Sequence, residues 1–200
     1  MKEAMIANNV PQYYIDSCLK IKYMFPKAHA VAYVLSALRI AWFKVHIPKA
    51  YYAAYFSVRA TGFSYEIMCQ GKERLDFYLK DFKKRKDTLS NKEKEQYADG
   101  RIVQEMYARG FTFMPLDIYR AQPHRFQIID GKLMPSLNSI EGLGDNAAIA
   151  IAEAAKNGPF LSKDDFRETT KTSRTVIELM SDLGLFGDLP ESNQLSLFDL

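Results

Sequence analysis

The sequence predicts a mainly α-helical protein that contains one small β-hairpin. Most apolar side chains recur at helical spacing, in segments that begin near Pro, Ser or Asn and end near Gly. The dipeptide Asp130-Gly131 lies between two short apolar runs, a pattern typical of a two-residue hairpin turn. Hydrophobic residues fill 48% of the 200 positions and aromatic residues 13%, which excludes a wholly disordered chain.

Three helices are predicted in the first third of the chain. The first begins at Pro11 and runs to about residue 23. The second, about 27–46, is apolar on nearly every face, so we expect it to be buried among other helices. Its apolar run, 28–43, is too short for a membrane anchor and carries charged side chains. A third helix covers about 48–59 and ends before Gly62.

The middle of the chain, residues 72–109, is charged and helical in pattern. Ser90 and Glu93 form a capping box for a helix that Gly110 ends. Before it lies a basic run that is as typical of a solvated face as of a phosphate-binding surface: Lys80, Lys83, Lys84, Arg85 and Lys86. The predicted hairpin strands are 126–129 and 132–134, and a last helical block runs from about 139 to 185.

Charge is unevenly distributed along the chain. Residues 1–100 hold 17 Lys and Arg against 10 Asp and Glu, a net charge of +7, and residues 101–200 hold 10 against 14, a net charge of −4. A basic half suits a phosphate-bearing partner, whereas the acidic last twenty residues suit a protein partner. Cys18 and Cys69 have no metal-like spacing and follow no leader, so we expect reduced thiols in a cytoplasmic protein that does not bind membranes.

The segment 140–151 resembles a helix-hairpin-helix motif. We expect Gly142 and Gly144 to let a short turn take positive φ and to leave its N–H groups uncovered. The next helix, with Asn146 in its first turn, would then hold one phosphate oxygen at its N-terminus. Such a motif binds the DNA backbone without reading the base sequence. The alternative is a tight glycine turn between packed helices.

The motif departs from its family at one position. Asp145 follows the second glycine, where the family often has a basic residue, and this weakens the expected phosphate contact. A second, degenerate copy is predicted at 169–184, where Lys171 and Arg174 would supply positive charge.

Two further segments, Phe25–Tyr33 and Trp42–Pro48, resemble the fingers domain of bacterial C-family replicative DNA polymerases. The later order of a strand hairpin, a Gly-Leu-Gly turn and the loop 158–160 resembles the same family. The ending Gln-Leu-Ser-Leu-Phe is similar to that of its PolC-type branch, the alpha subunit of DNA polymerase III. The resemblance implies a C-terminal fragment that lacks the palm domain, so it carries no catalytic residue and binds no cofactor or metal. The full-length polymerase would use Mg²⁺.

The resemblance also implies partners and site residues. Primed duplex DNA and a deoxynucleoside triphosphate would be bound, the latter near Lys27, His29 and Tyr33. The segment 194–200 resembles the peptide that grips the ring-shaped sliding clamp, and the implied clamp-binding residues are Gln194, Leu195, Ser196, Leu197 and Phe198. Four parts follow: fingers over 1–75, a charged helical connector with the hairpin over 76–135, the helix-hairpin-helix module over 136–190, and an extended tail over 191–200.

Two other functions are compatible with parts of the sequence. A stand-alone DNA-binding adaptor tethered to the clamp would have no need of the apolar helix at 28–43. A helix-hairpin-helix DNA glycosylase would place a catalytic Asp about twenty residues after the hairpin, where Asp164 lies. Its neighbours differ from the strand-like setting of that family, and no iron–sulfur set of cysteines is present.

Overall fold

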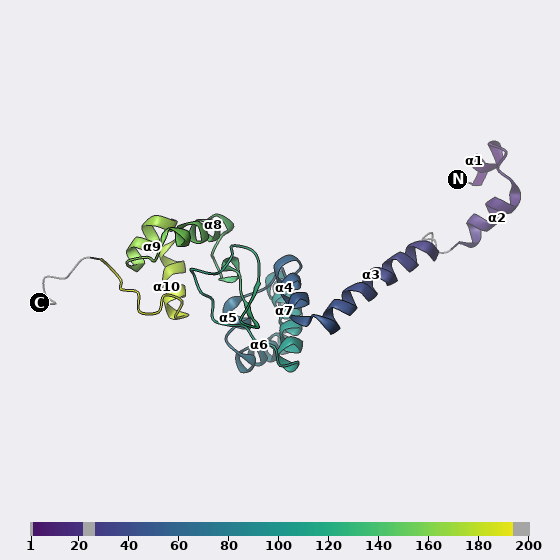
Figure 1. Cartoon of the computed structure of the whole chain (residues 1–200). Coiled ribbons are helices and arrows are strands. Elements are labelled where there is room, and N and C mark those ends of the chain that lie inside the picture. Colours follow the sequence, from purple (N-terminus) through teal and green to yellow (C-terminus); the bar gives the residue numbers. More distant parts are fainter. Residues whose placement is uncertain (1, 22–26, 194–200) are drawn as a thin grey trace, which may run out of the picture. The chain divides into compact units, whose positions relative to one another are not determined.

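The computed structural model describes residues 2–21 and 27–193 and divides the chain into two compact units, 1–42 and 43–200 (Figure 1). The first unit holds α1 (Lys2–Ala7), α2 (Gln12–Lys20) and most of α3 (Lys27–His46). Helix α2 follows Pro11 as predicted, because a proline at a helix start loses no intrahelical hydrogen bond. Ile15 is its one buried side chain.

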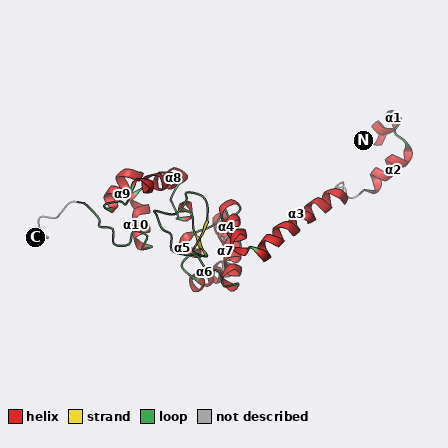
Figure 2. Ribbon diagram, in the orientation of Figure 1, coloured by secondary structure: helices red, strands yellow, loops and turns green. Residues whose placement is uncertain are grey.

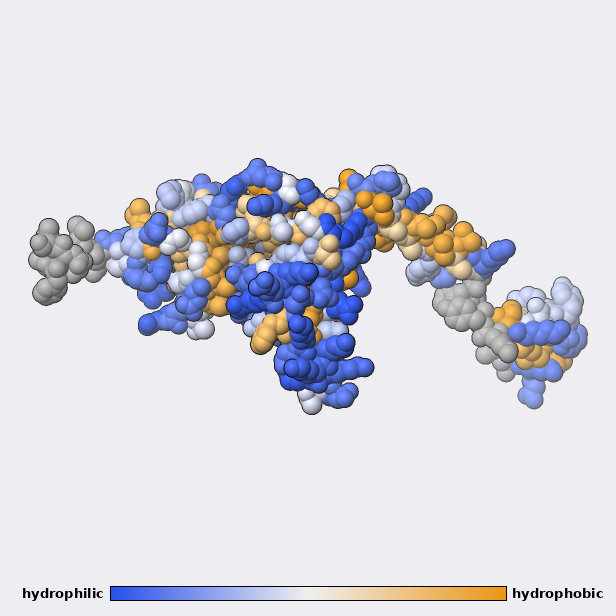
Figure 3. Space-filling model, turned by 90° about the horizontal axis from the view of Figure 1, so that it is seen from below, coloured by the Kyte–Doolittle hydropathy of each residue, from blue (hydrophilic) through white to orange (hydrophobic). Residues whose placement is uncertain are grey.

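The expectation that the helix at 27–46 is buried is wrong. Large apolar side chains of α3 are exposed, among them Leu38 at 61% and Trp42 at 53%. In the view of Figure 3, hydrophobic residues gather along this helix. The described elements supply too few neighbours to cover a helix that is apolar all round. Within the described ranges, α3 is also the one helix long and apolar enough to cross a membrane, with a mean hydropathy of 1.2, a test that core helices of globular proteins pass too.

The second unit begins with a helical core. It is built by α4 (Pro48–Val58), α5 (Tyr65–Met68), α6 (Lys72–Lys84) and α7 (Asn91–Ala108), with the short 3-10 turn η1 (Lys86–Thr88) between α6 and α7. The predicted capping box is present at the start of α7, where Ser90 Oγ accepts from Glu93 N–H and the Glu93 carboxylate accepts from Ser90 N–H. Apolar side chains at helical spacing on α6 and α7, including Leu75, Leu79 and Val103, are buried between them.

A two-stranded antiparallel sheet lies against this core (Figure 2). Strands β1 (Gln127–Ile129) and β2 (Lys132–Met134) pair with Ile128 opposite Leu133. The predicted turn is confirmed, since Asp130 and Gly131 both have positive φ. The loop before the sheet adds a parallel bridge between Phe113 and Leu133.

Three helices complete the second unit: α8 (Asp145–Ala154), α9 (Lys163–Thr170) and α10 (Arg174–Asp182), with 3-10 turns η2 (Leu137–Ser139) and η3 (Ala155–Asn157) on either side of α8. Phe166 and Met180 are fully buried in their shared core. The chain after α10 returns to α9, where the carbonyl groups of Pro190 and Glu191 accept hydrogen bonds from the N–H groups of Lys163 and Asp164.

Candidate nucleic-acid interface

The first hairpin turn joins η2 to α8 and differs in detail from the prediction. Gly142 has φ +78°, a conformation that costs L-residues strain, so glycine suits this position. Gly144 has φ −73° and ψ 161°, extended backbone that any residue adopts, and it is the N-cap of α8. The expectation that both glycines take positive φ is therefore wrong. Gly144 matters because it has no side chain to cap the first N–H groups of α8.

The second hairpin turn, between α9 and α10, repeats this backbone pattern. Lys171 has φ +57°, and Ser173 is the extended N-cap of α10 with φ −68° and ψ 151°. Each turn thus has one left-handed residue, one intermediate residue and one extended N-cap. The difference is that Ser173 Oγ accepts from Val176 N–H at 3.4 Å, so the second helix start is capped internally.

The two hairpins lie against each other. A Cβ atom on Gly142 would meet Cγ2 of Val176, a residue of α10, at 3.5 Å, which is ordinary van der Waals contact. Leu143, the middle residue of the first turn, and Val176 are both buried in the core that the three C-terminal helices share. Apolar packing therefore fixes the two helix N-termini within one module.

Both acidic residues beside the first turn lie close to basic side chains from outside the motif. Glu141 forms an ion pair with Lys92 in the first turn of α7. Asp145, in the unfavourable position noted above, lies 3.5 Å from Nδ1 of His124, an ion pair when that imidazole is protonated. The remaining predicted DNA-binding side chains are solvent-exposed: Asn146 in the first turn of α8, and Lys171 and Arg174 around the second turn, with Arg174 Nε donating to Glu178 at 2.9 Å.

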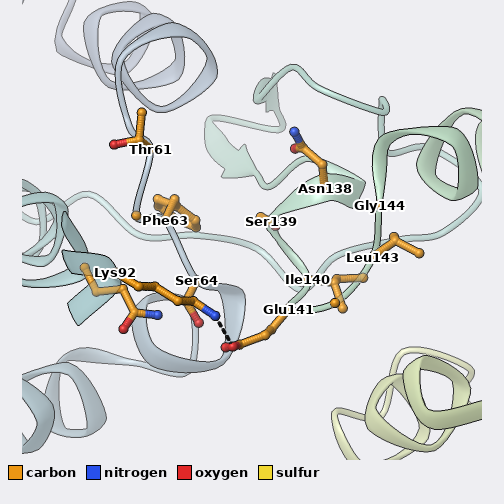
Figure 4. A pocket seen from close by; sticks show the side chains of 13 residues that line it. Thr61, Phe63, Ser64, Lys92, Asn138, Ser139, Ile140, Glu141, Leu143 and Gly144 are labelled. Carbon is orange, nitrogen blue, oxygen red and sulfur yellow. Dashed lines mark hydrogen bonds and ion pairs between the residues drawn. The ribbon is translucent and has the colours of Figure 1, made fainter. Parts of the chain in front are cut away.

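A hollow of about 310 Å³ separates the first turn from the loop 61–64 (Figure 4). The hairpin backbone from Ser139 to Gly144 forms one wall, and Lys92 and the buried Gln96 of α7 form another. Ser64 also lines it, 3% exposed, and its Oγ has no hydrogen-bond partner among the described residues.

Asp99 holds the loop side of this hollow in place. Its carboxylate accepts the Gly62 N–H at 2.8 Å and the Tyr55 hydroxyl at 3.4 Å. Burial raises the pKa of Asp99, and the Gly62 N–H acts in the opposite direction. Gly62 is required here by close approach, because an added Cβ would lie 2.3 Å from the carbonyl carbon of Glu95.

The predicted nucleotide-binding residues lie on α3. The rings of His29 and Tyr33 meet edge to face with centroids 4.5 Å apart, as their spacing of one helical turn predicts, and Tyr33 is 67% exposed. Lys27 is the first residue of that helix. The predicted clamp-binding residues, Gln194 to Phe198, lie outside the described part of the chain.

Lys92 and Ser64 were missed at the level of sequence. Lys92 lies 49 residues before Glu141 and Ser64 lies 77 residues before it, and no local sequence pattern links positions so far apart. The only signal was that Lys92 follows the helix cap at Ser90. Over residues 2–21 and 27–193, no three or more His, Cys, Asp or Glu side chains are grouped to hold a metal ion.

Comparison with known proteins agrees with this geometry. The helix-hairpin-helix motif family matches residues 110–195. Proteins named DNA polymerase III PolC-type are 49% identical in Caldanaerobacter subterraneus subsp. tengcongensis, 50% in Bacillus cereus and 51% in Listeria innocua, over 98–99% of this chain. The chain spans 14% of the length of each of these relatives. Over nearly its whole length, the chain is thus related to part of PolC-type DNA polymerase III and contains a helix-hairpin-helix motif.

Proposed function

We propose that the chain is the C-terminal part of a PolC-type replicative DNA polymerase and that its two hairpins bind the backbone of primed duplex DNA. The observation that carries this proposal is the matching pair of turns at Gly142 and Lys171, each of which leads into a helix N-terminus. N-terminal N–H groups and the helix dipole favour a phosphate at each site. Contacts of this kind read the backbone and carry no sequence information.

Duplex binding is tested by fluorescence anisotropy with labelled duplexes of unrelated sequence. We expect similar affinities for all of them and a steep fall in affinity with salt, because released counterions drive the binding. A strong preference for one sequence, or affinity that does not respond to salt, would contradict backbone binding by the hairpins. Absence of any duplex binding at low salt would overturn the proposal as a whole.

In the full-length polymerase, template-directed synthesis would need Mg²⁺ held by palm carboxylates, and α3 would contribute Lys27, His29 and Tyr33 to the nucleotide pocket. The exposed apolar faces of α3 support this placement, since the relatives are about seven times longer and offer further elements to cover it. We expect no nucleotide incorporation by the 200-residue chain on primed DNA with Mg²⁺. Incorporation by the pure chain would show that the catalytic carboxylates lie within it.

The segment 194–200 is proposed to tether this polymerase to the sliding clamp in the cytoplasm. Leu195, Leu197 and Phe198 are apolar side chains of the kind that anchor a docking peptide, and Gln194 would bind a polar subsite. A labelled peptide covering 190–200 should bind the clamp with micromolar affinity, roughly −8 kcal/mol. The double change of Leu197 and Phe198 to Ala should abolish that binding, whereas Ser196→Ala should change it little. Equal affinity of the parent and double-alanine peptides would refute the tether.

A further inference from the structure

The hollow beside the first hairpin contains an unused polar group. Ser64 is 3% exposed, and its hydroxyl has no hydrogen-bond partner in the described part of the chain. A buried hydroxyl without a partner is costly, and such groups are rare in folded proteins. Other buried serines nearby are paired: Ser139 Oγ, which lines the same hollow, donates to the Ser136 carbonyl at 2.5 Å.

The hollow is also lined by one cationic side chain, Lys92, whose ion pair is exposed to solvent. The charged residues that line it are Lys92 and Glu141, which are 63% and 42% exposed and pair with each other. A pair as exposed as this contributes little to stability, so exchange of its carboxylate for another anion costs little. In the view of Figure 4, the Lys92 side chain extends past Ser64 to reach Glu141.

We propose that this hollow is a second phosphate site, which takes a DNA backbone phosphate beside the one held at the N-terminus of α8, with Lys92 and Ser64 as ligands. The inference rests on the proposed duplex binding and extends it beyond the hairpin motif. A phosphate oxygen accepts from both an ammonium and a hydroxyl, which matches the two donors present. Lys92 would reach the phosphate by giving up Glu141, with which it pairs in this structure.

Ser64→Ala distinguishes a binding role from a structural one, because it should raise the Tm of the chain and lower its affinity for duplex. Removal of an unpaired buried hydroxyl should raise the Tm of the 200-residue chain by roughly 2–4 °C. The same change should weaken duplex binding by about tenfold, because a hydrogen bond to a charged phosphate is lost. Ser162→Ala is the matched control outside the hollow: Ser162 is also buried, and its Oγ accepts from the Asp165 N–H at 3.1 Å, so its Tm should fall while duplex affinity stays unchanged. Unchanged duplex affinity in Ser64→Ala, or an equal loss in both variants, would overturn the second site.

Lys92 and Glu141 supply an independent test through the salt dependence. Lys92→Gln should make the slope of log affinity against log salt less steep by about 0.9, the value for one phosphate contact. Glu141→Gln should tighten duplex binding by up to about fivefold, since Lys92 no longer has to leave a carboxylate. Lys156→Gln is the matched charge control, because Lys156 is exposed in η3, beyond the C-terminal end of α8 and away from the turn. A slope for Lys92→Gln equal to that of Lys156→Gln would contradict the proposal.

The outcomes also distinguish the inference from the function on which it rests. If the parent binds duplex with the expected salt dependence while Ser64→Ala and Lys92→Gln bind like the parent, the hairpin function stands and the second phosphate site is wrong. If the parent binds no duplex, both are wrong. Inorganic phosphate at millimolar concentration should compete weakly with duplex for the hollow. If phosphate also raises the Tm of the parent and this rise is absent in Ser64→Ala, free phosphate is an alternative ligand of the same chemistry.

Discussion

Gly142 and Gly144 look alike in the sequence, and the structure predicts that they respond differently to the same substitution. Gly142 has φ +78°, whereas Gly144 has φ −73°. An alanine forced into the left-handed region costs roughly 1–2 kcal/mol. No clash adds to this cost at Gly142, because the new methyl group would meet Val176 at 3.5 Å. Gly142→Ala should therefore lower the free energy of unfolding by about 1–2 kcal/mol, a large part of a typical domain stability.

Gly144→Ala is the matched control for this strain. Nothing lies within 4 Å of its added methyl group, and its backbone suits any residue, so the change in the free energy of unfolding should stay below about 1 kcal/mol. Urea unfolding of both variants, followed by circular dichroism at one pH, measures the difference. Equal losses in the two variants, or no loss in Gly142→Ala, would refute the assignment of the left-handed position.

Three further predictions follow from single contacts. Gly62→Ala should cost about 2–3 kcal/mol in urea unfolding, since its Cβ would lie 2.3 Å from the Glu95 backbone; a loss under about 0.5 kcal/mol would show that α7 can move aside. Lys171→Gly should stabilise the chain by about 1 kcal/mol by relieving φ +57° while weakening duplex binding, and a drop in Tm would contradict this. The Ser90 N–H, and next the Arg85 guanidinium, lower the pKa of Glu93 to about 2. The contribution of Glu93 to stability is therefore complete above the unfolded pKa of about 4.3 and is lost as pH falls toward 2. The difference in unfolding free energy between the parent and Glu93→Gln should shrink over that window, and a constant difference would contradict the prediction.

The features that the sequence predicted correctly depend on residues close together in the chain. The capping box joins Ser90 to Glu93, and the hairpin turn needs only Asp130 and Gly131. The helix-hairpin-helix motif was recognised in the same way, from a few residues around Gly142. Each of these signals is set by backbone preference and neighbouring hydrogen bonds, which tertiary packing did not override.

The features that were missed depend on distant residues. Which of the two glycines takes positive φ is a property of the folded turn, where Gly142 has φ +78° and faces Val176 of α10, and composition alone treats both glycines alike. The pairing of Lys92 with Glu141 joins positions 49 residues apart. The burial expected for α3 rested on the rule that an apolar helix needs neighbours, and that rule does not say which segment provides them.

The hydrogen bonds that Pro190 and Glu191 form with the N-terminus of α9 limit the distance between this module and the segment 194–200. Because these carbonyls accept hydrogen bonds from the N–H groups of Lys163 and Asp164, the chain is anchored at residue 191, and position 194 lies three residue steps further along the chain. Three residues span at most about 11 Å. If a ring-shaped partner binds the segment 194–200, it must therefore sit within that radius of the module, at a high effective concentration relative to duplex on the hairpins. The short connection would then limit how far the ring and the duplex can rotate relative to each other, whereas a long linker would let them rotate freely.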